Sequence, residues 1–316
     1  RSVMFTNLFA SSFRTDRAIP AIISGFPGQP TTSVMKFASK VENLPSIPAS
    51  LSDAGWKTAY YYGGDANFTN MLAYLVSCRF QKIVSDKDFP LSERTGKWGA
   101  HDHLVFRRAL HDAANADPAD PTPLFSVIQT SSSHEPFDVP FSSNHDSRQK
   151  NAFAYTDSCV ADFIDSLAVL PRARRTLVIL IPDHYGAWPR NLTDEIENHR
   201  IPMIMTGGAL GGRAMRVDTI AAQTDLAATL MAQLGIDSAP FSFSHDIFNP
   251  ISEKSAFFSS RTFATYADSS GFSTINIDTG DISDTDSGEP SADTATCRHR
   301  RLKATLQKLY QTLDSL

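Results

Sequence analysis

The stretch TLVILIPDHYG, residues 176–186, gives the strongest indication of the fold. Residues 177–181 are apolar throughout and are followed at once by a proline, an acid and an imidazole. A strand that is apolar at every position has both of its faces covered, as the strands of a parallel sheet do. The stretch therefore predicts a buried strand of a parallel sheet, with Asp183 and His184 directly after its carboxyl end.

The rest of the chain alternates strand-like and helix-like segments. Further β-rich runs lie at 58–62, 124–129 and 201–205. Apolar residues recur at helical spacing over 152–167 and again over 220–234, where Asp218 precedes the helix as a cap and Gly235 ends it. This alternation predicts an α/β fold, specifically an α/β/α sandwich around a mostly parallel central sheet.

Composition restricts the class of protein. With 316 residues and 41% apolar content, the chain is long enough for one large domain with an appendage. The net charge of −5 and the scattered basic residues exclude nucleic acid as a partner. The three cysteines are far apart, which argues against a zinc site or a disulfide framework. No apolar run approaches the roughly 18–20 residues of a membrane span.

Composition changes near residue 255. Residues 269–296 are rich in Ser, Thr, Asp and Gly, and the chain from Arg301 onward has the pattern of an amphipathic helix. We therefore predict a main domain over residues 1–254 and a C-terminal appendage over residues 255–316. The appendage is expected to be a hairpin followed by a helix, packed on the main domain.

Polar residues that directly follow the predicted strands are candidates for a functional site, because open α/β sheets bind ligands outside the carboxyl ends of their strands. Asp183 and His184 follow one strand, His134 follows another, and Asp65 and Asn67 belong to a glycine turn after a third. Each has an ordinary alternative. Asp183 could cap the next element beside a surface histidine, His134 could be a loop histidine, and the glycine turn could be a simple turn. Their convergence on one edge of the sheet favours function.

Thr15 begins the segment TDRAIPAIISG, residues 15–25. It is either an ordinary loop residue before a helix or a nucleophile at a helix N-terminus, where backbone N–H groups and the helix dipole stabilise an anion. The segment resembles the nucleophile helix of the alkaline phosphatase/sulfatase superfamily, in which a nucleophile opens the helix and a Ser/Thr-Gly pair follows at positions ten and eleven. That pair is Ser24 and Gly25 here.

Further segments occur in the order found in that superfamily. They are GWKTAYYYGGDANF (55–68), WGAHDH (98–103), TSSSHEPFDVP (130–140), YTDSCVADFIDSL (155–167), PDHYG (182–186) and HRIPMIM (199–205). Over about residues 5–250 the chain resembles the extracytoplasmic catalytic domain of lipoteichoic acid synthase-like proteins, which transfer phosphoglycerol. The resemblance implies a phospholipid or polyol-phosphate substrate at the outer face of a bacterial membrane, with the anchor upstream of this chain.

The resemblance also implies roles for individual residues. Thr15 would be the nucleophile and a metal ligand, Asp183 and His184 would be metal ligands, and His134 would contact the substrate phosphate or protonate the leaving oxygen. The implied cofactor is one divalent cation, Mn²⁺ in preference to Mg²⁺ or Zn²⁺. Such a cation lowers the pKa of a coordinated hydroxyl and withdraws charge from the phosphoryl oxygens. A two-step reaction through a phosphothreonine intermediate follows.

The chain departs from the superfamily pattern at the metal site. The superfamily supplies a further, acidic metal ligand from the end of its first strand, whereas residues 1–14 contain neither Asp nor Glu. Either the first strand lies upstream of this chain or the site is incomplete, and we expect the former. The nucleophile itself disfavours sulfatase chemistry, because formylglycine is made from Cys or Ser and Thr15 cannot form that aldehyde.

A second departure concerns the head group. Phosphoglycerol synthases carry a tryptophan and an arginine shortly after the glycine turn, where Thr69 and Met71 stand in this chain. We expect Arg17, Asp65 and Asn67 to take over substrate recognition. Three functional hypotheses remain: a metal-dependent phosphotransferase or phosphodiesterase, a sulfatase-like hydrolase of another anionic ester, and a non-catalytic lipid-sensing member of the fold.

The remaining histidines are expected to be structural. The HDH triplet at 101–103 could suggest a second metal, but it precedes a helix-like segment. His199 precedes a strand, and His245 lies in FSFSHDIFNP, where packing is the simpler explanation.

Overall fold

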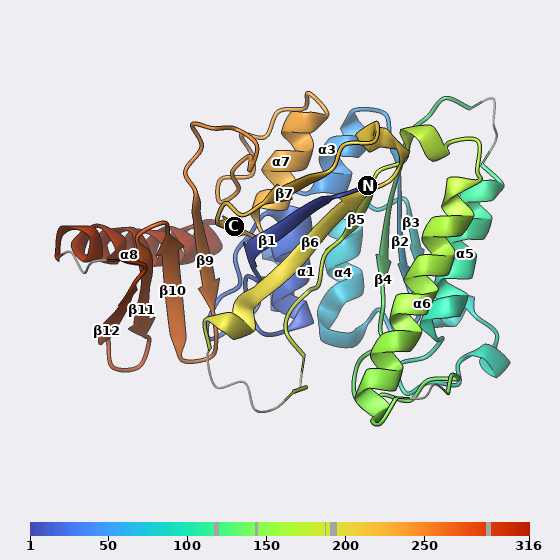
Figure 1. Ribbon diagram of the computed structural model, residues 1–316, viewed down its shortest axis with the longest axis horizontal. Coiled ribbons are helices and arrows are strands. Elements are labelled where there is room, and N and C mark those ends of the chain that lie inside the picture. The colour runs from blue at the N-terminus through green and yellow to red at the C-terminus, as the bar shows by residue number, and fades with distance from the viewer. Residues whose placement is uncertain (117–119, 143–144, 187, 190–194, 289–291) are drawn as a thin grey trace.

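The computed structural model describes residues 1–116, 120–142, 145–186, 188–189, 195–288 and 292–316. Helices cover both faces of a central sheet, as predicted (Figure 1). The central strands are β1 (Val3–Phe9), β2 (Lys57–Tyr62), β3 (Lys82–Val84), β4 (Leu124–Gln129), β5 (Val178–Leu180), β6 (Arg200–Thr206), β7 (Met215–Val217) and β8 (Ala221–Ala222). The helices of this part are α1 (Thr15–Ser24), α2 (Ala38–Val41), α3 (Ile47–Asp53), α4 (Met71–Ser77), α5 (Asp102–Ala114), α6 (Arg148–Ala168) and α7 (Asp225–Gln233).

The central sheet consists of two hydrogen-bonded parts. One has the order β5-β6-β1-β7, with β8 also paired to β1, and the other has the order β3-β2-β4. Strand β1 is parallel to β7 and β8, and β2 is parallel to β3 and β4, whereas β6 is antiparallel to both β1 and β5. The sheet is therefore mixed, and most of its strand pairs are parallel.

Strand β5 differs from the prediction for residues 176–181. It has three residues, its pairing in the described chain is with antiparallel β6, and its side chains are half-buried rather than buried. The reason is positional, because β5 lies at the end of one part of the sheet and β4 lies at the end of the other. Both strands line one large cleft, and β4 is also less buried than β2.

The C-terminal appendage is an antiparallel sheet with a helix packed against it. Its strands are β9 (Ser255–Ser259), β10 (Phe263–Asp268), β11 (Gly271–Asn276) and β12 (Ile282–Asp286), and its helix is α8 (Ala292–Ser315). The predicted hairpin is thus part of a four-stranded sheet, because the polar stretch after residue 269 also forms β11 and β12. Alternating polar residues suit an edge strand such as β12, whose middle three residues are exposed.

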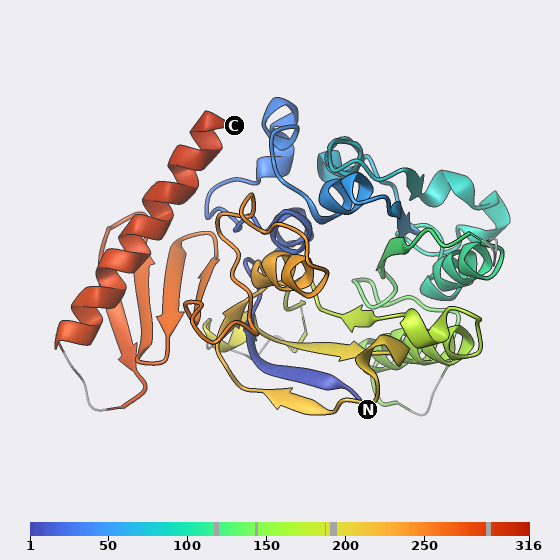
Figure 2. The same cartoon turned by 90° about the horizontal axis from the view of Figure 1, so that it is seen from above.

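The appendage shares a hydrophobic core with the main part of the molecule. Leu302, Leu309 and Leu313 of α8 belong to the same buried cluster as Ile19 and Ile23 of α1. Figure 2 shows α8 along one side of the molecule and α5 and α6 at the opposite side. In the described chain, no helix is both long and apolar enough to cross a membrane.

Candidate active site

Helix α1 presents Thr15 at its first position. The helix is anchored by Ile19 and Ile23, which are buried, and ends at Gly25, whose backbone is left-handed with φ 58°. The N–H of Gly25 donates to the carbonyl of Pro20, which satisfies one of the free carbonyl groups at the helix end. No side chain caps the helix, and the N–H groups of Arg17 and Ala18 donate to the Arg14 carbonyl. The helix therefore offers an anion beside Thr15 the N–H groups that precede Arg17 and the positive end of its dipole.

Thr15 lies against the two residues that follow β5. Its hydroxyl donates to Asp183 Oδ2 at 2.7 Å, and the same oxygen lies 3.3 Å from His184 Nε2. His184 Nε2 is also 3.3 Å from Asp183 Oδ2, so three polar atoms meet at one point. The other ring nitrogen of His184 faces the Tyr185 carbonyl at 2.7 Å. Because that carbonyl only accepts, Nδ1 carries a proton and the Nε2 of a neutral ring offers its lone pair toward Thr15.

These three atoms fit a divalent cation. Among the described residues, no group of three or more His, Cys, Asp or Glu side chains is arranged to hold a metal, so a cation bound by Asp183 and His184 would also need the threonine oxygen. Thr15 Oγ1, Asp183 Oδ2 and His184 Nε2 form a mixed oxygen and nitrogen donor set of the kind taken by Mn²⁺ or Zn²⁺. A ligating histidine usually donates its other N–H to a carbonyl, as His184 does to Tyr185.

Gln223 supports this site from behind and was missed in the sequence. Its amide nitrogen donates to the carbonyls of Pro182 and Asp183 at 2.9 and 2.8 Å, and its amide oxygen accepts from Ser11 N at 3.1 Å. The side chain is fully buried. It therefore joins the loop after β5 to the segment between β1 and Thr15. The available signal was a cluster of three polar residues, Gln223 among them, flanked by apolar residues in AAQTDLAA.

His134 lies on the rim of the same cleft. It is exposed, its Nδ1 faces the Glu135 carbonyl at 3.0 Å, and its ring stacks edge-on against Trp98 with the ring centres 4.7 Å apart. Trp98 donates to that same carbonyl at 2.7 Å. The ring of His134 is thus held by a tryptophan and a carbonyl, which leaves Nε2 for a ligand.

Asp102 fixes the loop that carries His134. This fully buried carboxylate accepts the backbone N–H groups of Ser131 and Ser132 and the hydroxyl of Thr156. Asp102 is also the first residue of α5, in agreement with the helix predicted after the HDH triplet. The triplet therefore has a structural task, and burial lowers the pKa of both of its histidines, His101 and His103.

The three residues predicted to bind substrate do not line the cleft. Arg17 is buried, and its guanidinium donates to the Gln29 carbonyl at 2.9 Å. Asp65 and Asn67 are exposed and form a local turn, in which Asp65 Oδ1 accepts the backbone and side-chain N–H groups of Asn67. These hydrogen bonds lower the pKa of Asp65. The assignment of substrate recognition to these residues stays a prediction that the lining of the cleft does not support.

The cleft itself has a volume of about 2570 Å³ and contains Thr15, His134, Asp183 and His184. It runs between β4 and β5 and is lined mainly by apolar side chains away from these polar residues. The polar and aromatic groups that line it near α1 and the glycine turn are Phe13, Arg14, Phe68, Thr69, Trp98, Ser260 and Arg261. The site thus combines the cluster of Thr15, Asp183 and His184 with a long apolar groove.

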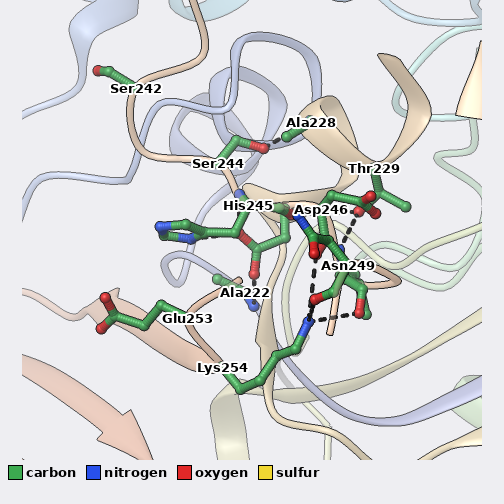
Figure 3. Close-up of polar contacts among 12 residues, drawn as sticks. Ala222, Ala228, Thr229, Ser242, Ser244, His245, Asp246, Asn249, Glu253 and Lys254 are labelled. Carbon is green, nitrogen blue, oxygen red and sulfur yellow. Dashed lines mark hydrogen bonds and ion pairs between the residues drawn. The ribbon is translucent and has the colours of Figure 1, made fainter. Parts of the chain in front are cut away.

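His245 lies in a separate polar cluster and has a structural role, as expected. Asp225 accepts the backbone N–H of His245 at 2.8 Å and lies 3.3 Å from its ring, and its other oxygen accepts Ala222 N (Figure 3). In the same cluster Lys254 donates to the carbonyls of Ile247 and Asn249. Polar contacts, rather than apolar packing, therefore fix the segment after α7.

Comparisons with known proteins agree with this arrangement. Residues 1–236 match the sulfatase family. Among curated proteins, the chain is similar to lipoteichoic acid synthase 2 of Bacillus subtilis (strain 168), with 24% identity over 231 residues, which are 65% of this chain and 35% of that protein.

Among solved structures, a protein in the alkaline phosphatase superfamily from Vibrio parahaemolyticus is 25% identical, with a TM-score of 0.85 over 98% of this chain and 79% of that chain. The lipoteichoic acid synthase LtaP from Listeria monocytogenes is 18% identical, with a TM-score of 0.82 over 100% of this chain and 84% of that chain.

These matches confirm the resemblance seen in the sequence motifs. The matched region spans only 35% of the length of the curated relative, so the matches establish family and fold rather than a particular reaction. Enzymes of this superfamily act on phosphoryl or sulfuryl esters and generally depend on divalent metal ions. The chain belongs to the sulfatase family, within the alkaline phosphatase superfamily.

Proposed function

We propose that residues 1–254 form the catalytic domain of a metal-dependent phosphotransferase or phosphodiesterase, with the appendage of residues 255–316 packed on it. Its substrate is a phosphoglycerol-type or related phospholipid head group. The observation that carries this proposal is the contact of Thr15 Oγ1 with Asp183 Oδ2 at 2.7 Å and with His184 Nε2 at 3.3 Å. A threonine in that position is a nucleophile held at a helix N-terminus rather than a precursor of an aldehyde.

In the proposed reaction Thr15 Oγ1 attacks the phosphorus, and the bond from phosphorus to the leaving oxygen breaks. His134 donates a proton to that oxygen. The hydroxyl proton that Thr15 shares with Asp183 in this structure would be lost to solvent once a cation is held between these two side chains. Water or an acceptor hydroxyl then attacks the phosphothreonine and regenerates Thr15. A divalent cation, with Mn²⁺ preferred, would be held by Thr15, Asp183 and His184 and would offset the charge on the phosphoryl oxygens.

The test compares the unsubstituted protein with Thr15→Ala and Thr15→Ser, using bis(p-nitrophenyl) phosphate as substrate and p-nitrophenyl sulfate as the competing ester. We expect phosphodiester turnover that Thr15→Ala abolishes, together with a phosphorylated Thr15 peptide in quenched reactions by mass spectrometry. Preferential turnover of the sulfate ester would replace the proposal with the hydrolase alternative. No turnover of either ester in the longest available chain would favour the non-catalytic alternative.

We also propose that the first strand of the sheet comes from a segment upstream of residue 1 and lies between β4 and β5. The support is the open sheet, since the facing edges of these two strands have no paired strand between them in the described chain. Side chains of α6, Val160, Phe163 and Ile164, line the cleft from one side, and those of α1 and α7 line it from the other. A strand apolar on both faces matches this groove.

Such a strand would run parallel to β4 and would need a crossover connection of about a dozen or more residues before β1. Its carboxyl end would then reach the Thr15 site, where an acidic residue would be a further metal ligand. The test is hydrogen exchange of β4 and β5 in this chain and in one extended upstream. Stronger protection of both strands in the extended protein supports the proposal, and unchanged exchange refutes it.

The setting is proposed on similarity alone. The similarity to lipoteichoic acid synthases favours the outer face of a bacterial membrane, with an anchor outside this chain. Protease digestion of intact spheroplasts, followed by immunodetection of the chain, distinguishes this location from an interior one.

A further inference from the structure

The appendage contributes one side chain to the cleft that contains Thr15. Arg261 lies at the tip of the tight turn between β9 and β10, which the hydrogen bond from Ser260 N to the Phe263 carbonyl closes at 3.0 Å. Arg261 is exposed and lines the cleft, and its guanidinium carbon lies 5.5 Å from the centre of the Phe13 ring. Phe13 is two residues before Thr15, so Arg261 contacts the segment that leads to Thr15 from a part of the chain far away in the sequence.

The turn is fixed to the nucleophile segment rather than loosely placed. Ser259, which is fully buried, donates its N–H to the Ser11 carbonyl at 3.0 Å and its hydroxyl to the Gly28 carbonyl at 2.8 Å. In return, the Ser12 hydroxyl donates to the Ser259 carbonyl at 2.9 Å. Three hydrogen bonds therefore hold the residue two before Arg261 against the backbone that leads to Thr15.

Positive charge exceeds negative charge at this point. The guanidinium carbon of Arg17 lies 4.9 Å from the centre of the Phe13 ring, and Arg17 forms an ion pair with Asp16. Arg14 Nε lies 3.4 Å from Oδ1 of the same carboxylate. Burial lowers the pKa of Arg17, and the nearby charges of Arg14 and Arg261 lower it further, whereas Asp16 raises it. Among the described residues, no carboxylate lies within ion-pair distance of Arg261, so one acid faces three guanidinium groups.

Arg17 is satisfied by Asp16 and a backbone carbonyl and does not line the cleft, so it is not free to bind a ligand. Arg14 and Arg261 do line the cleft, and the side chain of Arg14 is 48% exposed. Both act electrostatically on Arg17, and one carboxylate does not balance three guanidinium groups, so an anion bound in this part of the cleft would be stabilised. Guanidinium groups bind phosphate and carboxylate with paired, charge-assisted hydrogen bonds.

We infer that Arg14 and Arg261 form an arginine clamp that binds a second anionic group of the substrate, phosphate or carboxylate, next to the ester that reacts at Thr15. The inference rests on the proposed function, and it adds the class of substrate, namely an ester that carries a further negative charge. It also gives the appendage a task in recognition, since Arg261 is its only side chain that both carries a positive charge and lines the cleft in the described chain.

The test measures binding in a protein that cannot turn over substrate. Glycerol 1-phosphate and glycerol 1,3-bisphosphate are titrated calorimetrically into Thr15→Ala, and then into Thr15→Ala combined with Arg261→Gln, Arg261→Lys or Arg300→Gln. Arg300 is an exposed arginine on α8 in the same appendage and serves as the matched control. Loss of one charge-assisted contact is expected to weaken bisphosphate binding roughly 10- to 100-fold.

Binding of the monophosphate should change less than threefold in Arg261→Gln, Arg261→Lys should recover part of the loss, and Arg300→Gln should have no effect. Equal weakening of both ligands by Arg261→Gln would overturn the clamp, as would absence of bisphosphate binding by the parent protein. Circular dichroism melting curves establish that each variant is folded. Because the readout is binding without Thr15, failure of the clamp is separate from failure of the proposed reaction, which turnover and phosphothreonine formation report.

Discussion

Replacing Gln223 by leucine removes three hydrogen bonds from a fully buried position. Leucine has a similar volume, so the change leaves little cavity but strands the carbonyls of Pro182 and Asp183 and the N–H of Ser11. Each buried polar group left without a partner costs about 1–3 kcal/mol. Water from the neighbouring cleft can partly rehydrate the three groups, which favours the low end of that range, about 1 kcal/mol for each group. Gln223→Leu is therefore expected to lower the free energy of unfolding by roughly 3 kcal/mol.

The same substitution should reduce activity more than a loss of folded protein explains. The two carbonyls flank the backbone of Asp183, and a displacement of about 1 Å at a reacting group can cost 100-fold in rate. Urea denaturation measures the stability. Phosphodiester turnover, assayed about 20 °C below the melting temperature of the variant so that it is folded, measures the activity. Gln307→Leu on α8, where the side chain is exposed, is the control for a change of glutamine to leucine.

Gln223→Glu keeps the acceptor for Ser11 N but turns a buried carboxylate toward two carbonyl oxygens, so it should destabilise the protein at least as much as Gln223→Leu. A loss of stability below about 1 kcal/mol in Gln223→Leu would show that the three backbone groups find other partners. Unchanged turnover would show that Asp183 is placed without this amide. Either result refutes the positioning role.

Three further predictions concern stability. His245 has a raised pKa, chiefly because of its hydrogen bond to Asp225, so its stabilising contribution is complete below the unfolded pKa near 6.5 and is lost as the pH rises through the folded pKa. The free energy of unfolding should therefore fall above about pH 6.5 with a slope that His245→Gln reduces, and identical pH profiles would contradict this. Arg298 is fully buried and forms an ion pair with Asp286, so Arg298→Met leaves a partly buried carboxylate unpaired. Denaturant titrations should show that this substitution lowers the free energy of unfolding by roughly 3 kcal/mol. Gly25→Ala should lower stability by about 1 kcal/mol, since φ 58° is unfavourable for alanine; an unchanged melting temperature would mean that α1 ends differently.

The main elements could be predicted from local patterns. The run at 124–129 is β4 with the same bounds, and the run at 58–62 is β2 with one more residue at its start. The rule that polar residues gather after strand ends also brought Thr15, Asp183 and His184 together correctly, because it depends on topology rather than on side-chain detail.

Tasks that depend on long-range contacts could not be predicted from the sequence. Gln223 and Asp102 act on backbone groups 29 to 212 residues away, and no spacing in the sequence reveals such partners. Asp65 and Asn67 show the opposite case, since a hydrogen bond between near neighbours joins them in a local turn outside the lining of the cleft. Local pattern therefore identified side chains that meet at the candidate site, but not the residues that hold them in place.

The shared core of α1 and α8 has a consequence for the order of events during synthesis. Ile19 and Ile23, which hold the helix of Thr15, share a buried cluster with Leu302, Leu309 and Leu313, which leave the ribosome much later. Contacts between residues so distant in the chain form late in folding. A nascent chain that has not yet reached α8 thus carries the helix of Thr15 in an incomplete core, and docking of α8 completes the packing around that helix.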